Sequence, residues 1–151
     1  MMIVMVPGLC WRWKEGEGNW VSRKEMGIGR RQFTLTTLDN LPYAIGGLTT
    51  NQWNNGTMGT SAMQSYRKGH DRWVSHADYS LPIYRHCTVA DHTLKRLWVT
   101  GGTYHHNHHG GERSDVRYWD KNSNTWHHPK ADNIFTQDKA SFLEDFVAVS
   151  S

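Results

Sequence analysis

Cysteine is scarce in this chain. Among its 151 residues there are two, Cys10 and Cys87, which lie far apart and form no CxxC pair. A small secreted domain that depends on disulfides carries more cysteines at short, regular spacings. We therefore expect two reduced structural thiols and a cytoplasmic protein.

A long hydrophobic run is also missing. The apolar start, MMIVMVPGLC, has no basic beginning and runs directly into WRWKEGEG. A transmembrane helix needs about 20 apolar residues, and a signal peptide begins with basic ones. The segment is expected to be a β-strand, and no membrane association is predicted.

Neither sign of charge dominates. The chain has 17 Lys and Arg against 14 Asp and Glu, and these residues are scattered along it. Proteins that bind nucleic acid gather basic residues into a patch or stripe. A nucleic-acid partner is therefore not expected.

Signals for helices and for common catalytic sites are absent as well. No long 3.6-residue period survives the scattered Gly, Asn and Thr, no G-x-S-x-G occurs, and no acidic pair recurs around a histidine. The segment GIGRRQ (27–32) lacks the third glycine of a phosphate-binding loop. The sequence predicts an all-β, non-catalytic protein with no cofactor.

What the chain does contain is a repeating pattern of aromatic residues. Three segments align: WKEGEGNW (13–20), YRKGHDRW (66–73) and WDKNSNTW (119–126). Their first aromatics fall at 13, 66 and 119 and their last tryptophans at 20, 73 and 126, so both steps are 53. Equal steps at two landmarks indicate an internal repeat.

A double glycine marks a second landmark of the repeat. The run LPYAIGG ends at Gly46-Gly47 and RLWVTGG at Gly101-Gly102, while EDFVAVSS ends the chain with Ser150-Ser151 at the corresponding place. Such runs are strands by composition. Another candidate strand precedes each of them: QFTLTTL (32–38), RHCTVAD (85–91) and KASFL (139–143).

Each repeat thus contains four short strands, a to d. Strand b ends at Gly-Gly, strand c carries the first aromatic, and strand d carries the tryptophan. Four antiparallel strands at a period near fifty are typical of a propeller blade. The pattern resembles the kelch-repeat family, with tryptophan at 13 and 119 where that family usually has tyrosine. The residues that carry this resemblance are Gly46-Gly47 with Tyr66 and Trp73, and Gly101-Gly102 with Trp119 and Trp126.

The resemblance implies kelch-type β-propeller blades in an incomplete ring. Residues 1–22 are expected to end one blade, 23–75 and 76–128 to form two more, and 129–151 to begin another. Propellers have about four to eight blades, so three blades' worth of chain has two explanations. It is a piece of a longer kelch protein, or two chains associate head to tail as a homodimer that completes a ring.

Four histidines, His105, His106, His108 and His109, follow the second Gly-Gly. A structural zinc ion needs four ligands held tetrahedrally. Adjacent histidines in a glycine-flanked loop do not direct all their rings to one centre. We expect a polar loop and no metal site.

Kelch relatives capture partner proteins with their b–c and d–a loops. Here the b–c loops would be 48–60 and 103–114, and the d–a loops roughly 21–31, 74–84 and 127–139. Arg, Trp and Asn side chains suit a peptide with acidic groups. The candidate binding residues are Arg30, Arg31, Trp53, Asn54, Asn55, His105, His106, His108, His109 and Arg113.

The resemblance therefore predicts a non-catalytic protein-interaction module. In relatives such modules recruit substrates to cullin ubiquitin ligases or bind actin and other cytoskeletal partners. The alternative is a copper-dependent propeller enzyme that resembles galactose oxidase or acts on carbohydrates. The spacing of Cys, Tyr and His in this chain does not reproduce such a site.

The repeat makes a prediction about stability. Glycine allows φ > 0 where strand b ends and leaves room for a ring to lie on the backbone, so each tryptophan is expected to fill space between sheets. Trp73→Ala should lower the free energy of unfolding by roughly 3–5 kcal/mol. A urea unfolding midpoint unchanged by this substitution would count against the blade.

Overall fold

A computed structural model describes residues 2–6, 9–13, 16, 18–50, 57–106 and 109–129. This part of the chain consists of β-strands, joined by turns and by one short 3-10 segment, Lys68–His70. The described residues contain no helix that is long and apolar enough to cross a membrane. The predicted all-β class is confirmed.

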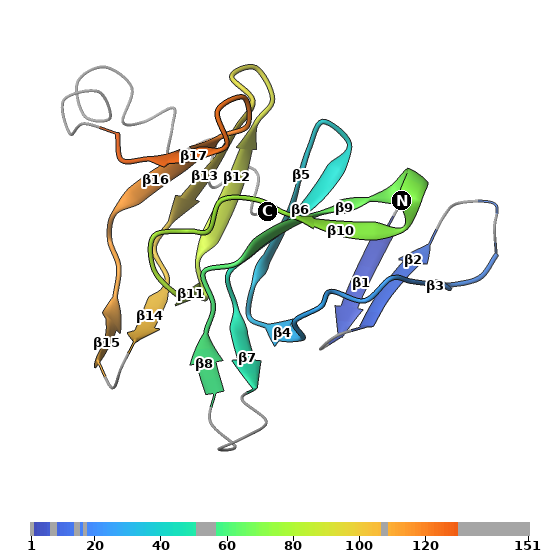
Figure 1. Ribbon diagram of the computed structural model, residues 1–151, viewed down its shortest axis with the longest axis horizontal. Helices are drawn as coiled ribbons and strands as arrows, with labels where there is room; N and C mark the ends of the chain where they lie inside the picture. Colours follow the sequence, from blue (N-terminus) through green and yellow to red (C-terminus); the bar gives the residue numbers. More distant parts are fainter. Residues whose placement is uncertain are drawn as a thin grey trace.

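Two four-stranded antiparallel sheets form the centre of the structure (Figure 1). The first blade consists of β5 (Thr34–Leu38), β6 (Leu41–Ile45), β9 (Met63–Arg67) and β10 (Arg72–Ser75). The second blade consists of β12 (Cys87–Asp91), β13 (Arg96–Thr100), β16 (Val116–Asp120) and β17 (Thr125–His127). In both, the spatial order follows the predicted a-b-c-d order.

The two blades repeat at the predicted interval. Strand a begins at 34 and at 87, and strand c at 63 and at 116, so both steps are 53. Strand b begins at 41 and at 96, a step of 55. The extra two residues lie in the a–b turn, which is Asp39-Asn40 in the first blade and residues 92–95 in the second.

The start of the chain forms a third sheet, with β1 (Met2–Val6), β2 (Leu9–Trp13) and β3 (Val21–Arg23) in that order. β2 carries Trp13 and is therefore strand c of this sheet. The apolar start, predicted as one strand, forms two that pair with each other. β1 occupies the place beside strand c that strand b has in the complete blades.

The sequence predicted simple loops between strands b and c, but these connections contain strands. They form the hairpins β7 (Leu48–Thr50) with β8 (Thr57–Gly59), and β14 (Thr103–His106) with β15 (His109–Glu112). Each hairpin pairs with a two-residue strand from the d–a connection, β4 (Arg30–Arg31) or β11 (Ile83–Tyr84). Both hairpins project from the same end of the blades (Figure 1). Threonine and tyrosine in these segments favour the extended backbone.

The double glycines have the predicted positive φ, 61° and 108° at Gly46 and Gly47 and 68° and 90° at Gly101 and Gly102. The atoms nearest to Gly46, Gly47 and Gly102 do not belong to a tyrosine or tryptophan ring. A Cβ built on Gly47 would lie 2.9 Å from the Arg31 carbonyl oxygen, and one on Gly102 would lie 2.9 Å from that of Tyr84. Glycine is needed because the backbone of the d–a connection passes this close.

A single hydrophobic core runs through both blades. The Trp119 ring centroid of the second blade lies 5.4 Å from that of Tyr43 in the first blade and 5.2 Å from that of His76. The core consists of Leu38, Tyr43, Ile45, Met63, Tyr79, Ile83, Leu97, Val99 and Trp119. The two blades are therefore packed as one body.

The repeating tryptophans take part in a repeated contact, here called the blade joint. Trp73 donates its indole N–H to the Lys24 carbonyl, and Trp126 donates to the Ala77 carbonyl, both at 2.9 Å. In the turn before Trp73, an Asp71 carboxylate oxygen accepts from the Lys24 backbone N–H at 2.9 Å and from the Tyr66 hydroxyl at 2.6 Å. Both polar groups of the Lys24 backbone are thus held by the next blade.

The second joint repeats this arrangement 53 residues later. The Asn124 side-chain oxygen accepts from the Ala77 backbone N–H and from the Trp119 indole, both at 3.0 Å. Asp71 and Asn124 have φ of 47° and 53°, and Gly18 at the corresponding position of the first sheet has 68°. Asp, Asn and Gly are the residues that most readily adopt this left-handed conformation.

Asn124 offers a test of the joint, because its hydrogen bonds can be separated from its backbone conformation. Asn124→Gly keeps the left-handed turn but removes the acceptor, and should lower the free energy of unfolding by about 1–3 kcal/mol. Asn124→Asp keeps the acceptor, as in Asp71, and should stay close to the wild type. Urea unfolding of the two variants measures the difference. Equal stabilities of the Gly and Asp variants would contradict the joint.

Candidate functional site

The ten candidate binding residues lie at the hairpin end of the blades or outside the described residues. Trp53, Asn54, Asn55 and His108 fall outside them. His105 and His106 belong to β14, and His109 to β15, where His106 pairs in register with His109. These three histidines therefore lie in strands and not in the irregular loop that was expected.

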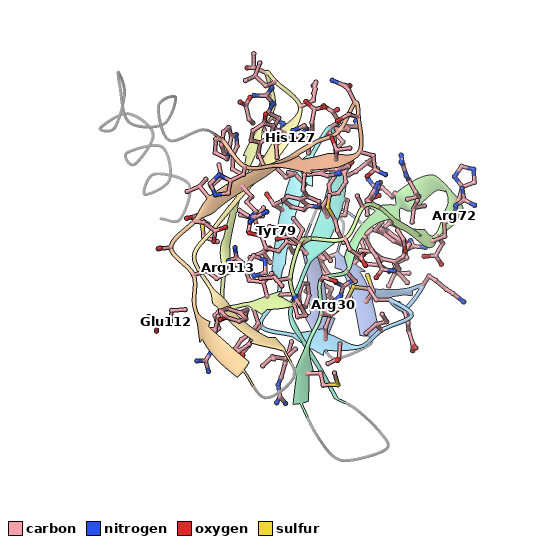
Figure 2. The ribbon with its side chains drawn as sticks, turned by 60° about the vertical axis from the view of Figure 1, so that its left-hand side comes forward. Arg30, Arg72, Tyr79, Glu112, Arg113 and His127 are labelled. Carbon is pink, nitrogen blue, oxygen red and sulfur yellow. The ribbon has the colours of Figure 1, made fainter. Side chains whose placement is uncertain are left out.

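Arg30 differs most from the expectation, because it is 2% exposed. Its guanidinium donates to the carbonyls of Gly46 and Ala62 at 3.2 and 2.7 Å, and to the Gln64 side-chain oxygen. Burial lowers the pKa of Arg30 to about 10. Arg30 therefore holds β4 to the first blade and is not available to a partner. Figure 2 shows it inside the molecule, whereas Arg72, the first residue of β10, lies at the periphery.

Arg31, its neighbour in β4, is exposed. Alternate residues of a strand point to opposite faces, so burying Arg30 turns Arg31 outward. One repeat after Arg31 stands Tyr84, and the next residue, Arg85, is exposed with its guanidinium carbon 5.9 Å from the centre of the Tyr84 ring. Two arginines thus lie at the exposed side of the d–a strands.

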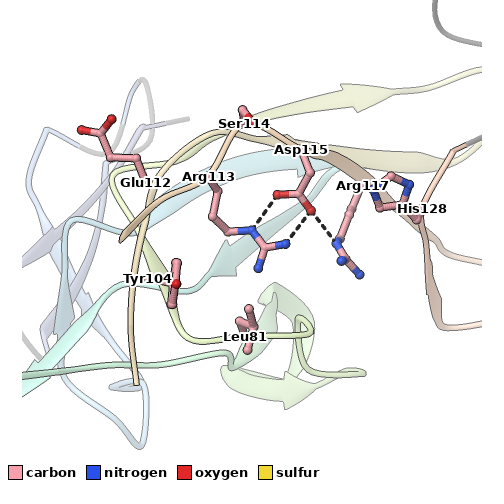
Figure 3. A pocket seen from close by; sticks show the side chains of 8 residues that line it. All are labelled: Leu81, Tyr104, Glu112, Arg113, Ser114, Asp115, Arg117 and His128. Carbon is pink, nitrogen blue, oxygen red and sulfur yellow. Dashed lines mark hydrogen bonds and ion pairs between the residues drawn. The ribbon is translucent and has the colours of Figure 1, made fainter. Parts of the chain in front are cut away.

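A pocket of about 530 Å³ lies beside the second blade (Figure 3). It is bounded by the d–a connection at Leu81, by the hairpin, and by β16. Its lining residues are Leu81, Tyr104, Glu112, Arg113, Ser114, Asp115, Arg117 and His128.

An ionic network forms one wall of this pocket. Arg113 donates two hydrogen bonds to the Asp115 carboxylate, both at 2.6 Å, and Arg117 donates a third at 2.9 Å. The bonds from Arg113 hold the pKa of Asp115 well below its usual range, and the Arg117 bond adds to this. Two guanidinium groups share one carboxylate, and Glu112, which lines the same pocket, balances the remaining positive charge.

The network is specific to the second blade. Subtracting 53 from Arg113, Asp115 and Arg117 gives Thr60, Ala62 and Gln64, none of them charged. In the first blade the Arg30 guanidinium reaches Ala62 and Gln64 instead. The residue one repeat after Arg30 is Ile83. Sequence reasoning proposed Arg113 but missed Asp115 and Arg117, which a position-by-position comparison of the two repeats would have marked.

Other titratable groups with shifted pKa values are bonded between the blades. Hydrogen bonds from Lys121 and Lys95 lower the pKa of Asp39 to about 2. Burial lowers the pKa of His86 to about 4, and its Nε2 lies 2.9 Å from the Thr34 hydroxyl. Each of these groups has a structural partner that accounts for its position.

The described residues contain no group of three or more His, Cys, Asp or Glu placed to hold a metal ion. Cys10 and Cys87 are free thiols in different sheets, and Cys10 is buried. Burial raises the pKa of both thiols, so they stay protonated at neutral pH.

The buried position of Arg30 makes a testable prediction. Arg30→Ala leaves acceptors on two connections without a donor and should lower the free energy of unfolding by about 1.5–3 kcal/mol. Arg72→Ala, at an exposed site, is the matched control and should change it by less than about 0.5 kcal/mol. Thermal or urea unfolding measures both variants. If they are equally stable, the guanidinium does not hold β4.

Comparison with known proteins finds a solved structure with a similar fold, but no match to a protein-family profile or to a curated sequence. No protein-family profile matches the chain, and no curated protein matches it. The solved structure of YjhT is similar, with a TM-score of 0.65 at 16% sequence identity. The similarity covers 80% of this chain and 44% of YjhT, so this chain spans less than half of that protein. With its antiparallel sheets of three and four strands, the chain has an incomplete β-propeller-like fold.

Proposed function

We propose that this chain is a non-catalytic protein-interaction module of the kelch-repeat class that acts in the cytoplasm. The observation that carries the proposal is the pair of hairpins β7–β8 and β14–β15, which project together from one end of the blades (Figure 1). Function in propellers lies in such connections, because the strands of the blades are used for packing. The partner would lie against the hairpins and the d–a strands beside them.

The charge at this end suits an acidic segment of a partner protein. Arg31 is exposed in β4, and Arg85 is exposed beside β11. In the pocket, Asp115 and Glu112 balance Arg113 and Arg117, so the support for an acidic partner comes from Arg31 and Arg85. Arginine binds carboxylates by paired hydrogen bonds, so an acidic peptide is the partner chemistry that this surface favours.

The bonding of the titratable groups supports a non-catalytic function. Asp39 and Asp71 accept hydrogen bonds from a neighbouring blade or connection, and Asp115 accepts from Arg113 and Arg117 of its own segment. A catalytic acid or base would instead have a free position facing a substrate. The roles of kelch relatives, recruitment of substrates to a cullin ubiquitin ligase or binding to actin, are the finer alternatives within this proposal.

A head-to-tail homodimer that completes a ring is a further part of the proposal. It would cover the outer face of the second blade and the outer face of the first sheet. Trp20, which precedes β3 of the first sheet, is 39% exposed. Sedimentation equilibrium of the purified chain measures its mass in solution. A monomer at every concentration would contradict the homodimer.

The interaction surface can be tested with peptides of defined charge. We expect a fluorescein-labelled peptide rich in Glu to bind, and the same peptide with Gln at each Glu to bind at least about tenfold more weakly, since charged hydrogen bonds contribute about 1.5–3 kcal/mol. Arg31→Glu should weaken binding of the Glu peptide, and Arg72→Glu, at the other end of the first blade, should not. Equal binding of both peptides would contradict an acidic partner.

A separate measurement addresses the enzyme alternative. A copper oxidase of the galactose-oxidase type binds one copper ion in a site of Tyr and His ligands. After incubation with Cu²⁺ and dialysis, we expect the chain to retain much less than one equivalent. Retention of one copper per chain together with alcohol oxidation would overturn the non-catalytic function.

A further inference from the structure

The connection that leads from the first blade into the second, residues 76–86, carries a histidine at each end. His86 lies between the two glycine pairs. Its Cε1 atom would lie 2.9 Å from a Cβ built on Gly46, and its own Cβ would lie 2.8 Å from one built on Gly102. It is 7% exposed. His86 therefore occupies space that a glycine of each blade leaves free.

The polar contacts of His86 are to uncharged groups. Its Nε2 lies 2.9 Å from the Thr34 hydroxyl, which in turn lies 2.7 Å from that of Thr88. Burial lowers the pKa of His86, and a hydrogen bond with the Ile45 backbone offsets only part of this effect. The charged group on the adjoining strand end is Arg30, whose guanidinium donates to the Gly46 carbonyl at 3.2 Å. A proton on this ring would thus meet a cation, and no carboxylate of the described residues is bonded to it.

His76 lies between the same two blades at the other end of the connection. Its ring centroid lies 5.4 Å from that of Tyr43 and 5.2 Å from that of Trp119. Its Nε2 lies 2.8 Å from the Ser65 hydroxyl. Burial lowers the pKa of His76, and the positive charges of Arg67 and Lys121 lower it further. Both histidines are therefore held in their uncharged form.

Between the two histidines, the connection is held on the first blade by main-chain hydrogen bonds. Tyr79 N–H donates to the Ser61 carbonyl at 2.9 Å, and Ile83 N–H donates to the Thr60 carbonyl at 3.2 Å. The Ile83 carbonyl accepts from Gly47 N–H at 2.7 Å. Because β11 pairs with β14, the place of the second hairpin depends on this connection.

The preceding repeat shows that the packing does not require histidine at this place. Phe33 stands 53 residues before His86. Its Cβ would lie 2.8 Å from a Cβ built on Gly47, the same distance as between His86 and one built on Gly102. A ring that cannot titrate fills the corresponding space there, so histidine at 86 adds a titratable group to an otherwise repeated contact.

We propose that His76 and His86 make this connection an acid-sensitive latch between the two blades. In the closed form both rings are uncharged and lie between the blades. A ring that takes up a proton must be solvated, so the connection leaves its place on the first blade and no longer fixes β11. A segment with a closed and an open form is the two-state element that a histidine switch requires.

The sign of the pH dependence follows from the closed form. The pKa of His86 is about 4 there, against an ordinary value of 6.5, so the open form binds more protons between these two values. The latch is therefore closed above pH 6.5, and opening becomes more favourable as the pH falls toward 4. From His86 alone, the opening equilibrium constant should rise roughly 20- to 30-fold between about pH 7.5 and 5.0. His76 acts in the same direction.

The carboxylates act at lower pH. The pKa of Asp39 is about 2, against an ordinary value of 3.8. The stability that this carboxylate contributes is lost only as the pH falls below about 4. Measurements between about pH 7.5 and 5.0 therefore separate the histidines from the acidic groups.

Amide hydrogen exchange of the full chain measures the opening. The protection factors of Tyr79 and Ile83, corrected for the intrinsic rate at each pH, should fall at least about 20-fold between about pH 7.5 and 5.0. Those of β6 and β13, inside the two blades, should change by less than about threefold. Unchanged protection of Tyr79 and Ile83, or an equal loss in every strand, would overturn the latch.

Variants assign the effect to the two rings. His86→Phe introduces the residue found one repeat earlier and should reduce the loss of protection by about tenfold or more. Adding His76→Gln, whose amide can still bond to Ser65, should remove the remaining loss. His92→Phe, at an exposed histidine of the a–b turn, is the matched control and should behave as the wild type does. A double variant that loses as much protection as the wild type would overturn the assignment.

A further readout needs no variant. In the nuclear magnetic resonance spectrum of the wild-type chain, the His86 ring, assigned by its proximity to Thr34, should stay in the neutral form down to well below pH 6.5. A His86 ring that titrates at its ordinary pKa would overturn the latch, whether or not the variants fold.

The latch goes beyond the proposed function, since it rests on contacts between the blades. Its measurements use the chain alone, without a partner. The latch can therefore fail while the Glu-rich peptide binds, and the peptide can fail to bind while the latch opens.

Discussion

The blade joint is the contact on which the rest of this structure depends. It clamps the backbone N–H and C=O of one residue, Lys24 or Ala77, between a tryptophan indole and a turn side chain of the next blade. Lys24 is exposed and Ala77 is half-buried, so the effect of these bonds is to fix the position of an extended connection on the next blade. Because the joint recurs after 53 residues, each blade is fixed relative to the one before it. The shared core around Trp119 then packs in one arrangement.

The joint and the double glycines lie at opposite ends of the blades. Lysines and carboxylates at the turn end are used to hold blades together, as Asp39 is between Lys95 and Lys121. At the other end the backbone of each d–a connection passes close over a glycine pair, and the hairpins continue beyond it. In the first blade Gly47 N–H donates to the Ile83 carbonyl at 2.7 Å, whereas Arg113 and Ser114 of the second blade line a pocket. The two repeats therefore differ most at this end, as Arg113 and Arg117 show.

Several elements could be predicted because their signals are local. The left-handed turns and the positive φ at Gly46 and Gly101 follow from which residues tolerate that conformation. The hairpins between strands b and c were missed, because their short strands become regular only by pairing with β4 and β11, far away in the sequence. The same holds for Arg30, whose acceptors at Gly46, Ala62 and Gln64 lie 16 to 34 residues further along the chain. No local pattern distinguishes it from the exposed Arg31.

By itself, the sequence determined the class and the period of this protein. Four-stranded antiparallel blades could be predicted from three patterns: equal steps between aromatics, glycine pairs after apolar runs and the lack of a helical period. These patterns are readable in the sequence because strand and turn preferences act over a few residues. The tertiary structure decided which charged groups are buried, which hold blades together and which face the pocket. Those outcomes depend on hydrogen-bond partners and on space between sheets, and both arise only when distant repeats are brought into contact.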